Sequence, residues 1–300
     1  MTRASTPLAE ALGHRTLVLD GGLGNQLTDQ GCDLSGGLWS ARVLAEDPAQ
    51  VRAAHTAYAR AGAEVLITAS YQVGLEAFAR HGYDRRRTTA LLRDAVTLAD
   101  GAARAVGHEV WVAASVGPYG ATLADRSEYR GRYGLSVREL AAFHRPRIET
   151  LLEAGADVLA LETVPDTDEA LALLSVLAGT GARAWLSYTV AGDRTRAGQP
   201  LADAFALAAA APEVIAVGVN CCAAADVLRA LETAAAATSK PLLAYPNDTS
   251  GTADWPLDAW QRAGARMIGG CCGVGPARIA ALADALPAAE PRGGGGRRSV

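Results

Sequence analysis

The sequence predicts a single (β/α)8 barrel of the TIM type, and three observations favour it. Eight short β-rich runs alternate with helical stretches along the 300 residues. The runs are continuously apolar, as in strands that a parallel sheet buries on both faces. Half of the residues are hydrophobic, which is enough for a large core. An open doubly wound sheet is the alternative, but no GxGxxG turn follows the first run, because the glycines of residues 20–24 are spaced differently.

The elements follow one another in a regular order. The predicted strands are residues 16–19, 64–68, 110–116, 157–161, 184–190, 214–219, 241–245 and 266–269. The predicted helices between them are residues 48–61, 85–106, 136–154, 166–179, 201–211, 223–237 and 257–263. Gly62, Gly155 and Gly264 each stand just past a helix, where a left-handed residue closes the last turn. We therefore expect one barrel domain over residues 1–290, with a disordered glycine-rich tail at 291–300.

Composition excludes several classes of function. The 28 basic and 32 acidic residues give a net charge of −4, so the basic surplus of a nucleic-acid-binding protein is absent. No run approaches the roughly 18 apolar residues of a membrane span. Residues 1–15 contain Arg3, Glu10, His14 and Arg15 and lack the apolar stretch of a secretory signal. We expect a cytoplasmic protein, a monomer or small homo-oligomer, whose partners are small molecules rather than nucleic acid or membrane.

Polar residues follow every predicted strand, at the barrel end where TIM-type enzymes carry their active sites. In chain order these are Asp20-Gly21-Gly22, Thr68 with Ser70 and Gln72, Ser115, Glu162, Tyr188, Asn220-Cys221-Cys222, Tyr245 and Gly269-Gly270-Cys271-Cys272. This arrangement predicts a site that many strands share.

The cysteines give the sharpest signal. Cys221 and the Cys271-Cys272 pair follow the sixth and eighth strands, so their thiolates can converge on one Zn²⁺ ion. Three thiolates with one open position are typical of a catalytic zinc site. The alternative is that cysteines pack as small buried hydrophobes. We favour that alternative for Cys32 and for Cys222, whose side chain strand alternation directs away from Cys221.

Taken together, these segments resemble the homocysteine S-methyltransferase family, in particular its S-methylmethionine- or S-adenosylmethionine-dependent bacterial enzymes. The chain is more remotely similar to betaine–homocysteine methyltransferase and to the homocysteine domain of cobalamin-dependent methionine synthase. The matching segments are residues 19–24, 38–41, 68–72, 115–120, 143–146, 161–163, 218–221, 245–247 and 269–273. The resemblance covers about residues 16–286, and it implies the barrel fold.

The resemblance also implies roles for residues. It implies that zinc is held by Cys221, Cys271 and Cys272, since Cys221 is the cysteine directly after Gly-Val-Asn. It implies that Glu162 and the Asp20 region hold the amino-acid end of homocysteine. One departure concerns the loop after Asn247, where residues 248–251 read Asp-Thr-Ser-Gly in place of the family's Ser-Gly-Glu. We expect this change to bear on the donor side of the pocket.

Further substrate contacts are expected around the same mouth. Glu162 and Asp20 can pair with the substrate ammonium, with helix capping as the alternative role. The amides of Gly21 and Gly22 can bind the carboxylate. The side chains that we expect beside them are Thr68, Ser70, Gln72 and Asn220. For Asn220, structural hydrogen bonding is an equal alternative. In the loop 117–134, Tyr119, Tyr129 and Tyr133 can attract a sulfonium, with an ordinary exposed loop as an equal alternative. Trp39 can pack over the substrate or simply anchor its segment.

The implied reaction is methyl transfer from a sulfonium, S-methylmethionine or S-adenosylmethionine, to the thiol of L-homocysteine, giving methionine with Zn²⁺ as the cofactor. Three alternatives stay open. The zinc can be structural, with Cys222 as a fourth ligand; the acceptor can be another thiol or a selenol; and the cysteines can form a redox pair. The last is disfavoured because the sequence has no CxxC. Betaine and methyltetrahydrofolate remain alternative donors.

Overall fold

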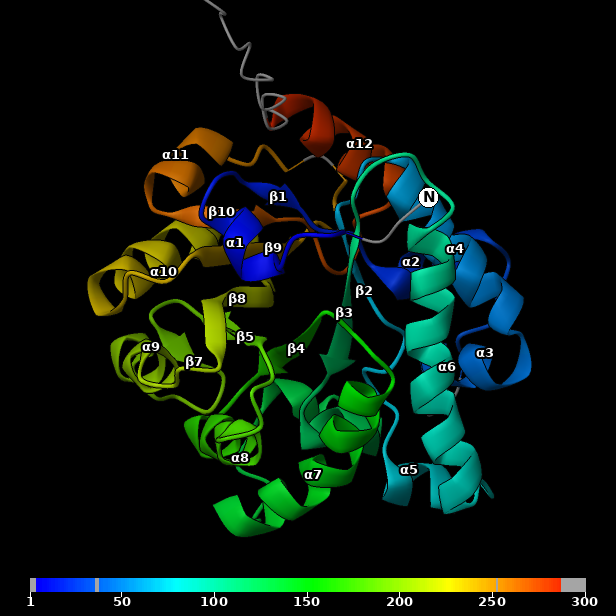
Figure 1. Ribbon diagram of the computed structural model, residues 1–300. Helices are drawn as coiled ribbons and strands as arrows, with labels where there is room; N and C mark the ends of the chain where they lie inside the picture. The colour runs from blue at the N-terminus through cyan, green and yellow to red at the C-terminus, as the bar shows by residue number, and fades with distance from the viewer. Residues whose placement is uncertain (1–3, 36–37, 252, 287–300) are drawn as a thin grey trace, which may run out of the picture.

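In the computed structural model, which describes residues 4–35, 38–251 and 253–286, eight parallel strands form a barrel. They are β1 (Leu17–Val18), β2 (Val65–Ile67), β3 (Trp111–Val116), β4 (Val158–Val164), β5 (Ala184–Tyr188), β8 (Val214–Ala223), β9 (Leu242–Asn247) and β10 (Ala265–Ile268). They run in the order β1-β10-β9-β8-β5-β4-β3-β2, and a bridge between Leu19 and Val65 joins β1 to β2. The predicted (β/α)8 barrel is confirmed (Figure 1).

Side chains of the strands alternate between two hydrophobic clusters. One set fills the inside of the barrel, and includes Trp111, Ala113, Val158 and Ala160. Their neighbours along the strands, such as Val112 and Leu159, pack outward against the helices. Both faces of each strand are therefore buried, which explains the continuously apolar runs in the sequence.

A helix follows each strand and covers the outside of the barrel (Figure 1). These helices are α4 (Pro48–Arg60), α6 (Arg85–Ala103), α7 (Val137–Glu153), α8 (Thr167–Leu177), α9 (Leu201–Ala209), α10 (Ala224–Ala237), α11 (Leu257–Arg262) and α12 (Pro276–Ala285). Ser136 and Glu139 form a capping box at the start of α7. Gly62, Gly155 and Gly264 have positive φ angles of 97°, 81° and 106°, as expected past helix ends.

Several short elements were not predicted from the sequence, because they are too short to show a clear apolar pattern. They are α1 (Leu8–Leu12), α2 (Leu23–Asp29), α3 (Trp39–Glu46), α5 (Leu75–Arg80), the hairpin β6 (Val190–Ala191) and β7 (Arg194–Thr195), and the 3₁₀ turns η1 (Tyr119–Leu123) and η2 (Ser127–Tyr129). The predicted tail at 291–300 lies outside the described residues.

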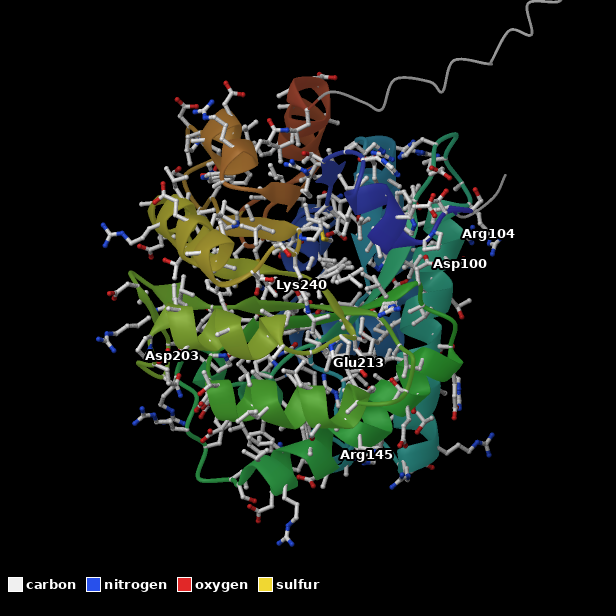
Figure 2. The ribbon with its side chains drawn as sticks, turned by 60° about the vertical axis from the view of Figure 1, so that its left-hand side comes forward. Asp100, Arg104, Arg145, Asp203, Glu213 and Lys240 are labelled. Atoms are coloured by element: carbon white, nitrogen blue, oxygen red, sulfur yellow. The ribbon has the colours of Figure 1, made fainter. Side chains whose placement is uncertain are left out.

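Charged side chains such as Arg145 and Asp203 extend from the outer helices (Figure 2). Among the described residues, we find no helix with the length and apolar character needed to cross a bilayer.

Helix α1 closes the N-terminal end of the barrel. Leu8, Ala11 and Leu12 are buried in the same cluster as the side chains inside the barrel. The indole nitrogen of Trp111 donates a hydrogen bond to the carbonyl of Thr6, 2.8 Å away, which ties the segment before α1 to β3. With this end closed, the opposite end is the one available for a site.

We expect Leu12→Ala to lower the free energy of unfolding by about 2–4 kcal/mol, because it leaves a cavity where α1 meets the barrel interior. Leu12 is 1% exposed. Glu10→Ala, on the exposed face of the same helix, is the control and should change stability by less than about 0.5 kcal/mol. Urea unfolding followed by circular dichroism measures both. Equal effects of the two changes would contradict the role assigned to α1.

Candidate metal and substrate site

A pocket of about 400 Å³ opens at the carboxyl ends of the barrel strands. Its walls carry residues from the ends of β1, β2, β3, β4, β8, β9 and β10, together with the start of α2 and part of the loop between β3 and α7. This is the end of a TIM-type barrel where active sites lie, and the volume suits small molecules.

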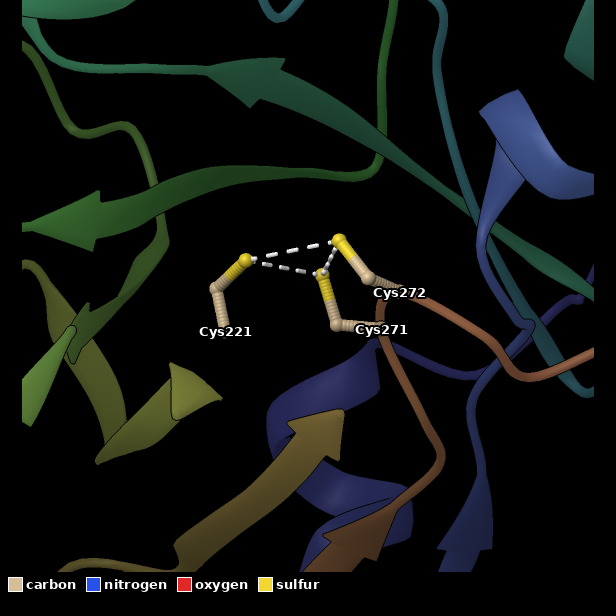
Figure 3. Close-up of side chains that lie close together, drawn as sticks. All are labelled: Cys221, Cys271 and Cys272. Carbon is tan, nitrogen blue, oxygen red and sulfur yellow. Dashed lines mark hydrogen bonds between the residues drawn. The ribbon is translucent and has the colours of Figure 1, made fainter. Parts of the chain in front are cut away.

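Three cysteine sulfurs meet in this pocket. The Sγ of Cys221 lies 3.4 Å from that of Cys271 and 3.8 Å from that of Cys272, and the Cys271 and Cys272 sulfurs are 4.0 Å apart (Figure 3). Zinc–sulfur bonds of about 2.3 Å at tetrahedral angles place sulfur atoms about 3.8 Å apart. The three separations bracket this distance, so the cluster can hold one metal ion.

A left-handed turn in β8 directs Cys221 into the pocket. Its φ angle is +52°, and the pairing of β8 with β9 shifts register between Asn220 and Ala223. Val217 and Val219 face the helices, so regular alternation would turn Cys221 outward as well. The turn reverses this alternation, and Cys222 packs in the hydrophobic core instead. The hydroxyl of Thr189 donates to the Cys221 carbonyl at 3.2 Å and holds the turn.

Two asparagines hold the loop that carries Cys271 and Cys272. The Oδ1 of Asn247 accepts the Cys272 amide hydrogen at 3.1 Å, and the Oδ1 of Asn25 accepts that of Gly273 at 2.8 Å. Gly273 has a φ angle of +85°, and a Cβ there would lie 2.3 Å from the Asp248 carbonyl oxygen. Only glycine allows this approach. Since the Asp248 amide donates to the Cys272 carbonyl at 2.9 Å, the altered loop after Asn247 contacts a cysteine of the cluster.

The thiols of the cluster differ in pKa, because each one is affected by the charge and hydrogen bonds of its neighbours. Hydrogen bonds to the Cys272 sulfur from Cys221 and then Cys271 lower the pKa of Cys272 to about 3. Hydrogen bonds with Cys221 and then Cys272, followed by burial and like charge, raise the pKa of Cys271 well above its usual value. One thiolate therefore suppresses the ionisation of its neighbours, and a divalent cation is the counter-charge that would allow all three to ionise.

Two buried carboxyl groups face the same pocket. Burial raises the pKa of Glu162 to about 7, and the hydroxyl of Ser115 donates a hydrogen bond to it. Burial also raises the pKa of Asp20 well above its usual value. The Asp20 oxygens accept from the Ile67 amide at 2.8 Å and from the Tyr245 hydroxyl at 3.0 Å.

The structure brings most of the predicted site residues together. The pocket walls include Cys221, Cys271, Cys272, Asp20, Gly21, Gly22, Thr68 and Glu162. The Gly22 amide, however, already donates to the Val274 carbonyl at 2.9 Å. Cys32 is partly buried against the hydrophobic core. Trp39 lies in the pocket wall.

Three further residues of the predicted set lie behind the pocket wall, where they bond to neighbouring backbone segments. Ser70 donates to the Ser115 carbonyl at 2.7 Å, and Gln72 donates to that of Ala121 at 3.2 Å. The Oδ1 of Asn220 accepts from the Thr163 amide at 2.7 Å and from the Ser187 hydroxyl at 2.8 Å. Thr163 has a φ angle of +58°, which is unusual for a β-branched residue, and Asn220 stabilises it.

The pocket wall also contains residues outside the predicted set of metal ligands and acceptor contacts. Asn25 and Tyr71 lie in the wall, and Glu128 and Tyr129 reach it from the loop after β3. The Tyr129 hydroxyl lies 3.0 Å from the Cys221 sulfur. The Oε2 of Glu128 is buried with no hydrogen-bond partner among the described residues. Sequence analysis noted this loop for its tyrosines, but nothing in its spacing indicated which side chains turn inward.

The chain is similar to known methyltransferases. The family model for homocysteine S-methyltransferase matches residues 17–286. Homocysteine S-methyltransferase of Escherichia coli (strain K12) is 45% identical over 291 residues, which cover 89% of this chain and 94% of that protein. Selenocysteine Se-methyltransferase of Brassica oleracea var. italica is 34% identical, with 88% and 87% covered.

A solved structure shows the same architecture. The metallated form of the Escherichia coli homocysteine methyltransferase MmuM superimposes with a TM-score of 0.88 at 45% identity, covering 93% of this chain and 100% of that one. The cysteine cluster of the present chain stands at the open end of that shared barrel. By the extent of these matches, the chain belongs to the homocysteine S-methyltransferase family.

Proposed function

We propose that this protein transfers a methyl group from a sulfonium donor, S-methylmethionine or S-adenosylmethionine, to the thiol of L-homocysteine, with zinc held by Cys221, Cys271 and Cys272. The observation that carries the proposal is the approach of these three sulfurs to within 4.8 Å of one another in the wall of a closed-bottomed pocket. Membership of the family supports the choice of acceptor.

The ligand set favours a catalytic zinc over a structural one. Structural zinc sites usually have four protein ligands, and catalytic sites keep one position for water or substrate. Within the described part of the chain, the cluster contains three ligand residues, and Cys222 is buried in the core instead. Zinc bound there would lower the pKa of a thiol so that the thiolate forms at neutral pH.

The carboxylates suit the amino-acid end of the acceptor. Homocysteine carries an ammonium group, and an opposite charge close by favours the ionised form of a buried carboxyl. Glu162 is 6% exposed and its pKa is about 7, so it is poised to ionise when a cation arrives. Glu128 offers a second buried carboxyl oxygen without a partner among the described residues. We assign the ammonium to these groups, with Asp20 beside them.

The charge of the site suits a sulfonium donor. Three thiolates and one Zn²⁺ ion carry a formal charge of −1, and an acceptor thiolate makes it −2. A sulfonium carries +1, so methyl transfer from its sulfur to the thiolate removes charge separation, which a water-excluding pocket favours. The bond from methyl to donor sulfur breaks as the bond to the acceptor sulfur forms. The chain's contribution is to align the two sulfurs.

Free thiols are needed at three positions, so we also infer a reducing compartment, the cytoplasm, for the working protein. The proposed partners are the two small-molecule substrates.

The deciding experiment measures methionine formation from homocysteine by mass spectrometry with S-methylmethionine, S-adenosylmethionine or betaine as the donor. We expect turnover with at least one sulfonium, loss of turnover after chelation of zinc, and recovery when zinc is restored. Cysteine and selenocysteine replace homocysteine in parallel reactions, because a relative is named for a selenol substrate. Turnover with betaine alone would contradict the donor, and no turnover with any pair would contradict the proposal.

Cys221→Ala, Cys271→Ala and Cys272→Ala should each reduce bound zinc from roughly one ion per chain to a small fraction, because two thiolates bind zinc far less tightly than three. Methyl transfer should be lost with the metal. The matched control is Cys222→Ala, at the adjacent position in β8, which should keep its zinc. Elemental analysis of the purified proteins gives the result, and zinc loss in the control would show that the wrong neighbour was chosen.

Glu162→Gln should stabilise the metal-free protein at pH 8 while impairing homocysteine binding. The folded-state pKa of about 7 exceeds the ordinary value of 4.5, so burial favours the protonated carboxyl. Folding stability is therefore lost as pH rises from 4.5 through 7, by at most about 3 kcal/mol. The gain in the variant should appear at pH 8 and be small at pH 4.5.

Urea unfolding at both pH values measures this difference. The control is Glu149→Gln on the outside of α7, where the carboxylate is exposed and the change should have little effect at either pH. Equal stability of Glu162→Gln and the parent protein at pH 8 would contradict the prediction, because it would show that ionisation of Glu162 does not destabilise the fold.

A further inference from the structure

Three fully buried polar side chains lie behind the pocket and have no part in the proposed reaction. His144 and Arg147 stand on the inner face of α7, and Glu169 stands in the first turn of α8; each has an exposed fraction of 0%. Burying a charged group costs free energy unless partners compensate it, so a buried set of this kind needs a structural or functional reason.

Arg147 joins the ends of two barrel strands. Its Nη1 donates to the Gly117 carbonyl at 3.0 Å, and its Nη2 donates to the Tyr71 carbonyl at 2.9 Å. Gly117 begins the loop after β3, and Tyr71 lies in the pocket wall after β2. Burial lowers the pKa of Arg147 to about 10, so the guanidinium stays charged at neutral pH. Its planar fork fixes both strand ends at once.

Glu169 holds the next part of the same loop. Its Oε1 accepts from the Tyr119 amide at 2.6 Å and from the His144 ring at 2.9 Å. Burial lowers the pKa of His144, which favours the neutral ring. The ring then donates from Nε2 to Glu169, and its Nδ1 faces the Arg147 guanidinium at 3.5 Å. Arg147 and Glu169 thus compensate each other's charge across a neutral histidine.

Within the loop of residues 117–134, a close backbone contact links the segment that Glu169 holds to the segment that lies in the pocket wall. A Cβ on Gly120 would lie 2.5 Å from the Glu128 amide nitrogen, so the segment after Tyr119 packs directly on the backbone of Ser127 and Glu128. Glu128 and Tyr129 in turn lie in the pocket wall, and the Tyr129 hydroxyl is 3.0 Å from the Cys221 sulfur. The path from Glu169 to the cysteine site is therefore continuous.

We propose that Arg147, His144 and Glu169 act as positioning residues, which hold the loop of residues 117–134 so that Glu128 and Tyr129 face the cysteine site. The inference rests on the proposed function for the role of Glu128 and Tyr129, but the contacts made by Arg147, His144 and Glu169 themselves lie outside the cysteine cluster. None of the three residues touches the pocket, and they act through Gly117, Tyr119 and Tyr71.

His144→Leu is the first test, paired with His144→Gln, whose amide nitrogen can replace the Nε2 donor to Glu169. We expect the leucine variant to keep its zinc and lose about 100-fold in kcat/KM, as a misplacement of about 1 Å can cause. The glutamine variant should recover most of the loss. Hydrogen exchange should quicken in residues 117–134 of the leucine variant and stay unchanged in residues 214–223 and 265–273. His81→Leu, at an exposed histidine, is the matched control.

Arg147→Lys is the second test and decides the question if the leucine variant does not fold. Lysine keeps the buried positive charge but lacks the fork that joins two carbonyls, so we expect faster exchange in residues 117–134 and a loss of at least about tenfold in kcat/KM. Arg145→Lys, two positions away on the outer face of α7, should behave as the parent protein (Figure 2).

The outcomes separate the two proposals. Wild-type kinetics and exchange in Arg147→Lys would overturn the positioning role, as would equal failure of both His144 variants with exchange raised throughout the barrel. A parent protein that binds zinc but methylates no acceptor would instead overturn the proposed function, and the exchange measurements would still report on the loop.

Discussion

The site depends on a single backbone reversal at the end of β8. Strand alternation turns Val217 and Val219 toward the helices, and it would bury Cys221 there as well. The positive φ angle of Cys221 sends its sulfur into the barrel mouth and leaves Cys222 in the core. A left-handed residue that is not glycine costs about 1–3 kcal/mol unless its surroundings fix it. Thr189 supplies part of this constraint through the Cys221 carbonyl.

A second left-handed residue, Thr163, stands in β4 near the same end of the barrel, and the Asn220 side chain bonds to both its amide and its hydroxyl. The residue before it, Glu162, faces the pocket, as the residue after Asn220 does. One asparagine thus fixes the strand ends that present a carboxyl group and a thiol of the cysteine cluster. The backbone strain at Cys221 and Thr163 thus lies at the carboxyl ends of the strands, where chemistry is expected in a barrel of this type.

Negative charge is the common character of the pocket. Three thiols and the carboxyl groups of Asp20, Glu162 and Glu128 face a volume of about 400 Å³, and burial alone disfavours their ionisation. Such a pocket is best stabilised by cations, and the proposed reaction brings three kinds of them: a metal ion, ammonium groups and a sulfonium. The charge of Arg147 stays behind the wall, where Glu169 compensates it. It therefore does not compete with these cations for the acidic groups of the pocket.

The sequence by itself determined the barrel, because eight apolar runs separated by helices leave few other ways to bury both strand faces. It also indicated that Cys221, Cys271 and Cys272 lie at one end of the barrel, since the carboxyl ends of parallel strands meet there. Only the tertiary structure decided which groups face inward. Ser70, Gln72 and Asn220 bond to neighbouring backbone segments instead of lining the pocket, whereas Asn25, Glu128 and Tyr129 line it. Loop packing and two reversed φ angles set these directions, and neither follows from the spacing of residues along a chain.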